Sequence, residues 1–274
     1  MSLFELIRLN GKQALVTGAG RGIGKGCALE LAASGADLIL NDRPGSEDLY
    51  QTAAEVRALG RRCTTVEADV FSSQGAHTLI RDAVEKSGAI DILVSNPAYG
   101  KRGELLDFSA TDFDQVVDAT FKSGFHISQV AARHMVHRAR GGKILFVSSV
   151  HAQMPIARNA PYGAAKAALN HLTQSMAVEL FEHRINVNAI EPGWIDTPNE
   201  RATFTDEVID AEAKTLPWGR LGTPAEIGHA AAFLVSAAAD YITGTILTVD
   251  GGFRFKDMRS QMQPHDSPLP QNRN

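Results

Sequence analysis

Two side chains four residues apart, Tyr162 and Lys166, have the chemistry and the spacing of a proton-transferring pair. The helix predicted around them would place residues i and i+4 on one face. A tyrosine has an ordinary pKa of about 10, but a neighbouring ammonium group stabilises the phenolate and lowers that pKa. Such a pair could exchange a proton with a substrate oxygen. Taken by itself, the motif could equally be a pair on a helix face with no function.

A pair of serines favours the catalytic interpretation of Tyr162 and Lys166. Ser148 and Ser149 end the apolar segment KILFVSS, which is predicted to be a strand. Ligands of open α/β sheets bind at the carboxyl ends of the strands. A hydroxyl group there can hold a carbonyl or alcohol oxygen beside Tyr162. The sequence therefore predicts a catalytic site formed by Ser149, Tyr162 and Lys166, with Ser149 and Tyr162 contacting the substrate.

The glycine-rich segment TGAGRGIG lies between a predicted strand and a predicted helix. In this context glycines permit a tight turn, close approach of the backbone to a pyrophosphate, and close packing of the helix on the sheet. The helix N-terminus adds unpaired N–H groups and the positive end of a dipole. The segment predicts a dinucleotide site at Gly18, Arg21, Gly22, Ile23 and Gly24.

Acidic residues follow two of the predicted strands. Asp42 ends the second strand, where a carboxylate can accept hydrogen bonds from ribose hydroxyls and would repel a 2′-phosphate. This favours NAD over NADP, although the guanidinium of Arg43 could bind a phosphate. A solvated turn is the alternative interpretation. Asp69 and Val70, after the third strand, could face the adenine, or they could simply end a strand without touching a ligand.

The wider pattern alternates strands with helices. We expect strands at Gln13–Thr17, Leu38–Asn41, Cys63–Glu67, Ile90–Val94, Lys143–Val147 and Ile185–Ile190. We expect helices at Gly22–Ser34, Leu49–Leu59, Ser73–Lys86, Thr111 to about Arg138, and about Ala160 to Leu180. The strands are apolar without alternation, as expected when helices cover both faces of a parallel sheet. The fold class is therefore a single α/β domain with a doubly wound, three-layer sheet.

Two regions depart from this rhythm. Residues from about 197 to 220 are predicted to be an insertion that could cover the site. After Gly252 the chain turns polar, and Pro264, Pro268 and Pro270 argue against helix or sheet. We assign residues 1–255 to the domain and residues 256–274 to a polar C-terminal tail, which by composition alone would be mobile.

Composition excludes several classes of protein. The chain has 274 residues and a formal net charge of −4, which gives no sign of a nucleic-acid partner. It has no run of eighteen apolar residues and no signal peptide, so no membrane partner is expected. Only Cys27 and Cys63 are present, too few for a disulfide framework. We expect a cytoplasmic protein with no metal site.

Together these motifs resemble the short-chain dehydrogenase/reductase family over residues 9 to 253. TGAGRGIG, Ser149, YGAAK, EPGWIDTP from Glu191 and YITGTILTVDGG from Tyr241 follow in the family's order. The resemblance implies a Rossmann sheet, usually in a tetramer, and hydride exchange between a nicotinamide and a carbonyl or alcohol carbon. Here the partner would be a small molecule and the assembly a homotetramer.

The resemblance also assigns roles to residues. Tyr162 would be the general acid and base, and Ser149 would position the substrate oxygen. Lys166 would lower the pKa of Tyr162, and both Lys166 and Tyr162 would contact the cofactor. The carboxamide end of the cofactor would meet residues of the EPGWIDTP segment, namely Pro192, Gly193, Ile195 and Thr197.

The sequence departs from the family pattern in two places. Ser95-Asn96-Pro97-Ala98 stands where the family has Asn-Asn-Ala-Gly; Asn96 keeps one amide for the cofactor side, but Pro97 has no N–H to donate. Thr120 stands at the family's fourth catalytic position, an asparagine that helps to hold a water linking the lysine to solvent. A threonine hydroxyl cannot offer a separate amide donor and carbonyl acceptor. We therefore expect a weakened proton relay.

The substrate stays open at this level. SSVHAQMP, from Ser148, resembles the bacterial glucose 1-dehydrogenases, in which a histidine also follows SSV. His151 could bind a sugar hydroxyl, or it could be a loop residue at the rim. Further polar candidates are Lys101, Arg102, Asn199 and Glu200. The alternatives are a 3-oxoacyl-[acyl-carrier-protein] reductase, a steroid or other secondary-alcohol dehydrogenase, and a cofactor-sensing regulatory protein without turnover.

Overall fold

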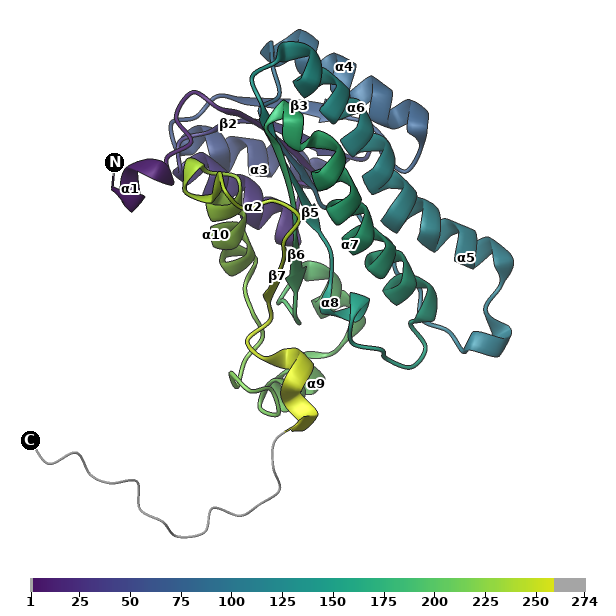
Figure 1. Cartoon of the computed structure of the whole chain (residues 1–274). Coiled ribbons are helices and arrows are strands. Elements are labelled where there is room, and N and C mark those ends of the chain that lie inside the picture. Colours follow the sequence, from purple (N-terminus) through teal and green to yellow (C-terminus); the bar gives the residue numbers. More distant parts are fainter. Residues whose placement is uncertain (1, 259–274) are drawn as a thin grey trace, which may run out of the picture.

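The computed structural model describes residues 2–258. Seven parallel strands form one sheet in the order β3-β2-β1-β4-β5-β6-β7 (Figure 1). The strands are β1 (Gln13–Thr17), β2 (Asp37–Asp42), β3 (Cys63–Glu67), β4 (Ile92–Ser95), β5 (Gly142–Val147), β6 (Ile185–Pro192) and β7 (Ile246–Val249). The order turns back at β1, which pairs with β2 on one side and β4 on the other. Such a switch point opens a ligand crevice at the carboxyl ends of the strands.

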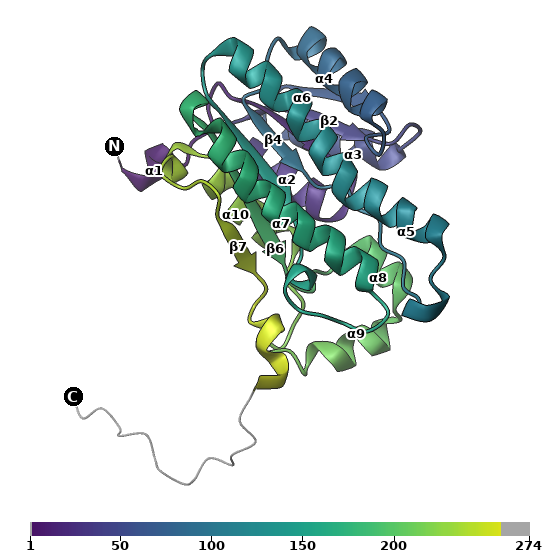
Figure 2. The same ribbon diagram turned by 45° about the vertical axis from the view of Figure 1, so that its right-hand side comes forward.

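Helices cover both faces of the sheet (Figures 1 and 2). The α-helices are α1 (Leu3–Leu6), α2 (Gly22–Ala33), α3 (Glu47–Ala58), α4 (Ser73–Ser87), α5 (Ala110–Val117), α6 (Ser123–Arg138), α7 (Ala160–Leu180), α8 (Pro198–Thr203), α9 (Asp206–Ala213) and α10 (Pro224–Leu234). One apolar layer joins α2, α3 and α10 to the sheet, and a second joins α4, α6 and α7. The predicted doubly wound architecture is confirmed.

All six predicted strands are present, with ends that differ by two residues at most. The seventh strand, β7, and the helix α10 were not predicted as elements. The N-terminus of α10 nevertheless carries a recognisable signal. Thr223 and Glu226 form a capping box, in which each side chain bonds the other residue's backbone N–H, and Pro224 begins the helix.

The single helix expected from Thr111 to about Arg138 is wrong. A π-helical turn, Asp118–Lys122, separates α5 from α6. Thr120 in this turn is buried, and its hydroxyl donates to the Tyr99 carbonyl at 2.8 Å and accepts from the Tyr99 N–H at 3.1 Å. The widened turn therefore holds the loop that follows β4. Turns of this kind are rare and occur frequently at functional sites.

The segment from about 197 to 220 forms α8 and α9. In Figure 2 these helices lie in the lower part of the molecule, near the end at which α7 begins. Its apolar side chains Phe204, Ile209 and Leu216 form a small separate cluster, which Phe253 joins from the chain's C-terminal part. Residues Phe253–Met258 form a 3₁₀ helix, so the expectation of no helix after Gly252 is wrong there. The rest of the predicted tail, 259–274, lies outside the described residues.

The sequence analysis expected no disulfide, no membrane span and no metal site, and residues 2–258 can be compared with these three expectations. Cys27 and Cys63 are both free thiols, as expected. Within this range no helix is long and apolar enough to cross a membrane. The same residues contain no group of three His, Cys, Asp or Glu side chains that could hold a metal ion.

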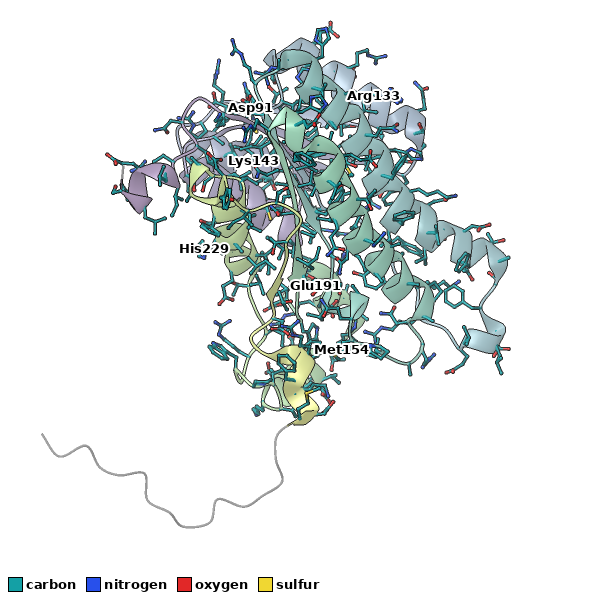
Figure 3. The ribbon with its side chains drawn as sticks, viewed as in Figure 1. Asp91, Arg133, Lys143, Met154, Glu191 and His229 are labelled. Atoms are coloured by element: carbon teal, nitrogen blue, oxygen red, sulfur yellow. The ribbon has the colours of Figure 1, made fainter. Side chains whose placement is uncertain are left out.

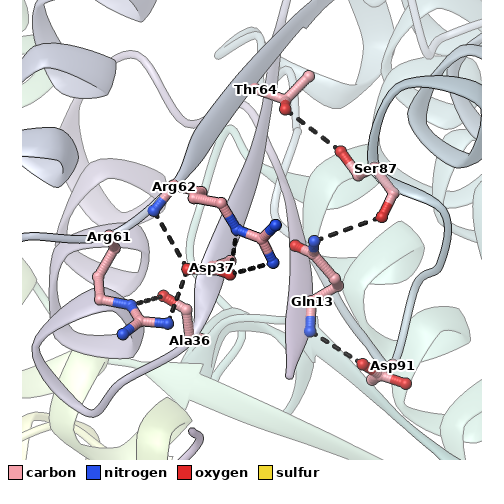
Figure 4. A network of polar contacts seen from close by, with 8 residues as sticks. All are labelled: Gln13, Ala36, Asp37, Arg61, Arg62, Thr64, Ser87 and Asp91. Atoms are coloured by element: carbon pink, nitrogen blue, oxygen red, sulfur yellow. Dashed lines mark hydrogen bonds and ion pairs between the residues drawn. The ribbon is translucent and has the colours of Figure 1, made fainter. Parts of the chain in front are cut away.

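Polar contacts tie together the strand ends that lie away from the crevice (Figure 4). Asp37, at the start of β2, is buried, and its carboxylate accepts from Arg61 Nη2 at 2.7 Å and from Arg62 Nε at 2.8 Å. Beside it the Gln13 N–H, which begins β1, donates to Asp91 Oδ2 at 2.9 Å. Burial opposes ionisation of Asp37, but the bonds from the two arginines outweigh it and lower the pKa of this carboxyl.

We predict that Asp37→Asn destabilises the fold in a pH-dependent way. A carboxyl whose pKa is lowered by folding contributes stability above its unfolded pKa of about 3.9, and that contribution is lost as the pH falls through the folded pKa. The variant should lose about 1–2 kcal/mol of unfolding free energy at pH 7. Urea titrations should show the gap to the unmodified protein closing below about pH 4.

The matched control is Asp82→Asn, which removes an acid from the more exposed Arg81–Asp82 pair. Exposed pairs of this kind contribute little, so its unfolding free energy should change by less than about 1 kcal/mol at either pH. A gap for Asp37→Asn that stays constant from pH 7 to pH 3 would contradict the assignment to the ionised carboxylate.

Candidate active site

The helix α7 presents Tyr162 in its first turn and Lys166 in its second. Lys166 is only 2% exposed, and its Nζ donates a hydrogen bond of 2.7 Å to the carbonyl of Val147, the last residue of β5. The same Nζ lies 5.6 Å from the centre of the Tyr162 ring. The amine is thus held between the end of the strand and the phenol, as the i, i+4 spacing predicted.

The two serines after β5 have different partners. Ser149 is 8% exposed, and its side chain acts on Tyr162 in the direction that lowers the pKa of the phenol. Its Oγ also accepts from the His151 N–H at 3.2 Å. The Ser148 hydroxyl instead donates to the backbone carbonyl of Lys166 at 3.3 Å. Ser149 therefore faces the phenol, and Ser148 fixes the strand end to α7.

Burial controls the protonation of both central groups. It raises the pKa of Tyr162 to about 12, a shift that the bond with Ser149 reduces and the charge of Glu200 increases. Burial also lowers the pKa of Lys166 to about 7. The predicted lowering of the Tyr162 pKa by Lys166 requires the ammonium form of Lys166, which burial of this amine disfavours.

The glycine turn fits a pyrophosphate. Gly18 and Gly22 have φ values of +60° and +55°, which favour glycine. A Cβ on Gly24 would lie 2.0 Å from the Gly18 carbonyl oxygen, so the helix could not approach the strand with any larger residue there. Arg21 is the N-cap of α2 and makes no side-chain cap bond, which leaves N–H groups at that helix end for an anion. Ile23 instead packs against the core.

Asp42 lies directly against this turn. Its carboxylate accepts from the Gly20 N–H at 3.1 Å, the Ser46 hydroxyl at 3.2 Å and the Arg43 N–H at 2.8 Å. A Cβ on Gly20 would collide with the same carboxylate. The Arg43 side chain is exposed and has no ion-pair partner within residues 2–258. Asp42 is therefore placed at the glycine turn, where the ribose of a dinucleotide would lie.

Three further residues predicted to bind the cofactor follow the strands β3 and β4. Asp69 is exposed after β3 and Val70 is buried beside it, with Asp69 Oδ1 accepting from the Phe71 N–H at 3.0 Å. Asn96, after β4, donates its amide to the carbonyl oxygens of Thr17 at 3.3 Å and Gly18 at 3.2 Å. In the altered Ser-Asn-Pro-Ala segment, this amide is thus used to hold the glycine turn.

The segment after β6 reaches back to the glycine turn. Pro192 ends the strand and is buried, and the Gly193 N–H donates to the Val249 carbonyl at 3.1 Å. Ile195 is 5% exposed. Thr197 caps α8, and its side chain would lie 3.4 Å from a Cβ on Gly22. The structure therefore brings the first and the last of the predicted cofactor residues together.

The Thr120 hydroxyl has only one proton, and it donates that proton to the Tyr99 carbonyl. The loop that it holds continues to Gly100, where a Cβ would lie 3.3 Å from the ring of Tyr162. Sequence reasoning missed Tyr99 and Gly100. Glycine at this position, directly before the candidate residues Lys101 and Arg102, was the available signal.

His151 lies beside the phenol, and the charges of Glu200 and Arg102 act on the His151 ring. The His151 ring lies 6.4 Å from the Tyr162 ring, centre to centre, with its Nδ1 3.4 Å from the Met154 carbonyl. Burial is the main cause that lowers the pKa of His151. The Met154 carbonyl raises that pKa, Arg102 lowers it and Glu200 raises it, so both charges act on the ring.

The structure separates the other polar candidates. Arg102 places its guanidinium carbon 5.2 Å over the Phe204 ring, whereas Lys101 pairs with Asp112 at 2.7 Å. Glu200 accepts from the indole N–H of Trp194 at 2.8 Å. Asn199 is exposed on α8. His151 therefore lies beside Tyr162, with the charges of Glu200 and the exposed Arg102 acting on its ring, and Lys101 pairs with Asp112 instead.

Comparison with known proteins agrees with this geometry. The family described as Enoyl-(Acyl carrier protein) reductase matches residues 18–254. The 2-dehydro-3-deoxy-D-gluconate 5-dehydrogenase of Escherichia coli K12 is 39% identical over 253 residues, which is 92% of this chain and 98% of that protein.

Two solved structures are similar over nearly their whole length. A 7α-hydroxysteroid dehydrogenase with NADH and 7-oxo glycochenodeoxycholic acid gives a TM-score of 0.87 at 36% identity, covering 92% of this chain and 98% of that one. A proposed 2-deoxy-D-gluconate 3-dehydrogenase from Agrobacterium tumefaciens with bound NADP gives 0.83 at 35% identity, covering 90% and 98%. The chain belongs to the short-chain dehydrogenase/reductase family and is a nicotinamide-dependent dehydrogenase that acts on CH–OH groups.

Proposed function

We propose that this enzyme oxidises a secondary alcohol of a sugar acid, a polyhydroxylated chain that ends in a carboxylate. The observation that carries the proposal is the position of Arg102. Its guanidinium is stacked over Phe204 and acts on His151, and it has no acidic partner within residues 2–258. A guanidinium can bind a carboxylate through two parallel hydrogen bonds.

The neighbours of Arg102 suit the rest of such a substrate. His151 and the Glu200 carboxylate can bind hydroxyl groups, since a carboxylate accepts and an imidazole can accept or donate. An acyl chain or a steroid nucleus would offer these groups no further hydrogen bond, whereas a polyol would. The relative from Escherichia coli and the Agrobacterium structure are both named for gluconate derivatives, which also favours a sugar acid.

Proton transfer at the reacting carbon is proposed for Tyr162. The Ser149 hydroxyl would hold the substrate oxygen, and the phenolate form of Tyr162 would take its proton while Lys166 remains bonded to the Val147 carbonyl. A bound nicotinamide would supply the hydride acceptor, and the positive charge of its oxidised ring would favour that phenolate. Thr120 would position the loop at Tyr99 and would not relay protons, because its hydroxyl is already occupied.

NAD is the proposed cofactor, in preference to NADP. The Asp42 carboxylate accepts hydrogen bonds from the Gly20 and Arg43 N–H groups and from the Ser46 hydroxyl, and as an ionised acceptor it could also bind a ribose hydroxyl. A 2′-phosphate placed there would meet this negative charge. Related structures contain NADH in one case and NADP in another, so the family leaves the choice to residues such as Asp42 and Arg43.

The homotetramer, the cytoplasmic location and the resemblance to glucose 1-dehydrogenases stay predictions. None of them is needed for the sugar-acid proposal, which depends on Arg102 and its neighbours.

Tyr162→Phe should lower kcat/KM for alcohol oxidation by about 10²–10⁴-fold, because it removes the proton acceptor and little volume. The dissociation constant for NADH, measured by fluorescence titration, should change little. The matched control is Tyr241→Phe, the same chemical change at a fully exposed tyrosine, which should leave turnover intact. Full activity in Tyr162→Phe would refute the proposed role.

Arg102→Ala should raise KM for D-gluconate about 10- to 100-fold, the effect of losing a charged hydrogen-bond pair. KM for NAD should stay constant. Lys101→Ala is the matched control, because it removes the adjacent cation, which is paired with Asp112. Equal effects of the two substitutions, or equal loss of affinity for D-glucose and D-gluconate in Arg102→Ala, would argue against a carboxylate anchor.

Asp42→Ala should shift the ratio of kcat/KM for NAD over NADP at least about tenfold towards NADP, which corresponds to about 1.4 kcal/mol. The physical reason is the loss of a negative charge opposite the 2′-phosphate. Asp69→Ala removes an exposed acid from the next strand end and should leave the ratio unchanged. An unaltered ratio in Asp42→Ala would show that Asp42 does not read the ribose.

A further inference from the structure

A completely buried carboxylate, Glu191, lies near the end of β6 where the strand approaches the site (Figure 3). Its oxygens accept hydrogen bonds from Asn170 Nδ2 at 2.6 Å, from Gln153 Nε2 at 2.8 and 3.1 Å, and from Thr248 Oγ1 at 3.1 Å. None of these donors carries a charge. A buried carboxylate is costly unless hydrogen bonds compensate it, so this cluster needs an explanation.

Each donor belongs to a different part of the active site. Gln153 follows the short 3₁₀ helix Val150–Ala152, directly after Ser149. Asn170 lies four residues after Lys166 on α7, so the face that carries the catalytic pair continues to Glu191. Thr248 lies on β7. One carboxylate therefore joins the catalytic loop, the catalytic helix and the last strand.

A cation orients the third donor. Arg254 Nη1 donates to Thr248 Oγ1 at 3.0 Å, so the Thr248 hydroxyl proton is left to point at Glu191 Oε2. A chain of bonds from a guanidinium through a hydroxyl to a carboxylate polarises each member and strengthens the whole. Arg254 thus compensates the buried charge without touching it, and it links the 3₁₀ helix after β7 to the same cluster.

The loop from Ser149 to Met154 needs such an anchor. Its backbone bonds are local: the Gln153 N–H donates to the Val150 carbonyl at 3.0 Å and the Met154 N–H to the same oxygen at 2.8 Å. Gln153 is itself largely exposed, yet its amide reaches inward to Glu191. That side-chain bond ties the loop to β6.

We propose that Glu191 is a positioning residue that fixes the loop Ser149–Met154, and with it the Ser149 hydroxyl and the His151 ring, relative to α7. The requirement is for a group that only accepts hydrogen bonds, since every contact comes from a donor. An ionised carboxylate meets this requirement. A glutamine of the same shape would turn an NH₂ group against these donors.

The test uses Glu191→Gln in the full-length protein and reads the loop directly. Hydrogen exchange by mass spectrometry should show the amides of residues 151–154 exchanging about 10- to 100-fold faster, the effect of losing a charged buried hydrogen bond. Exchange in β1 and α2 should stay unchanged, as should the dissociation constant for NADH. With D-gluconate as substrate, kcat should fall while KM for NAD stays constant.

A reciprocal exchange supplies the rescue. Gln153→Glu alone places two carboxylates together and should free the loop in the same way. The double variant Glu191→Gln with Gln153→Glu restores a donor opposite an acceptor and should return exchange at residues 151–154 to within about threefold of the unmodified protein. Thr248→Val, which leaves the bonds from Gln153 and Asn170 in place, should give a smaller effect than Glu191→Gln.

Asn188→Ala is the control for general destabilisation. Asn188 is buried on the same strand, but its amide bonds Ile242 and Thr245 and not the catalytic loop. It should lower the melting temperature without changing exchange at residues 151–154. Unchanged loop exchange in Glu191→Gln, or a double variant as open as the single ones, would overturn the proposal. Because exchange needs no substrate, this result is independent of whether D-gluconate is turned over.

Discussion

The hydrogen bond from the buried Lys166 amine to the Val147 carbonyl sets the geometry of the whole site. It joins the second turn of α7 to the last residue of β5, and both the phenol and Ser149 take their positions from these two elements. The bond also explains why the amine can be buried at all, because an unpaired amine or carbonyl there would carry the full cost of desolvation. The helix face then continues from Lys166 to Asn170 and Glu191, so the same alignment serves the catalytic pair and the anchor of its loop.

The two ends of the sheet have different chemistry. At the amino ends, the Asp37 carboxylate accepts bonds from Arg61 and Arg62, and the Gln13 N–H donates to Asp91. At the carboxyl ends, the α2 N-terminus and Arg102 offer donors without protein partners among the described residues. Stability and binding capacity are thus placed at opposite edges of one sheet, and a substitution at one edge need not disturb the other.

Sequence patterns predicted most of this fold because its strands are short apolar runs buried on both faces. The segment Ile246–Val249 has a strand-like composition, but the sequence analysis used it only as part of a family motif and did not assign it as the strand β7. The π-helical turn Asp118–Lys122 was not predicted either; there the Thr120 hydroxyl bonds Tyr99, which is 21 residues away in the sequence. Spacing placed Tyr162 beside Lys166 correctly. It could not show that burial would raise the pKa of one and lower that of the other.

The choice between Lys101 and Arg102 marks another limit of the sequence. Adjacent cations on a loop are equivalent until Asp112 and Phe204 are placed around them by elements far along the chain. The sequence likewise showed Glu191 only as part of a motif. Its hydrogen bonds could not be predicted, because the three donors come from segments up to 57 residues away.

The widened turn at Asp118–Lys122 affects how related chains should be compared. A residue in an α-helix advances the direction of its side chain by about 100°, so one extra residue changes the angular phase of everything on its far side. α5 and α6 are therefore continuous in length but out of phase with each other. A single-residue gap that falls here in an alignment would not be a harmless loop variation. It would rotate α5 about its own axis, turn buried Val116 away from the core, and separate Thr120 from Tyr99.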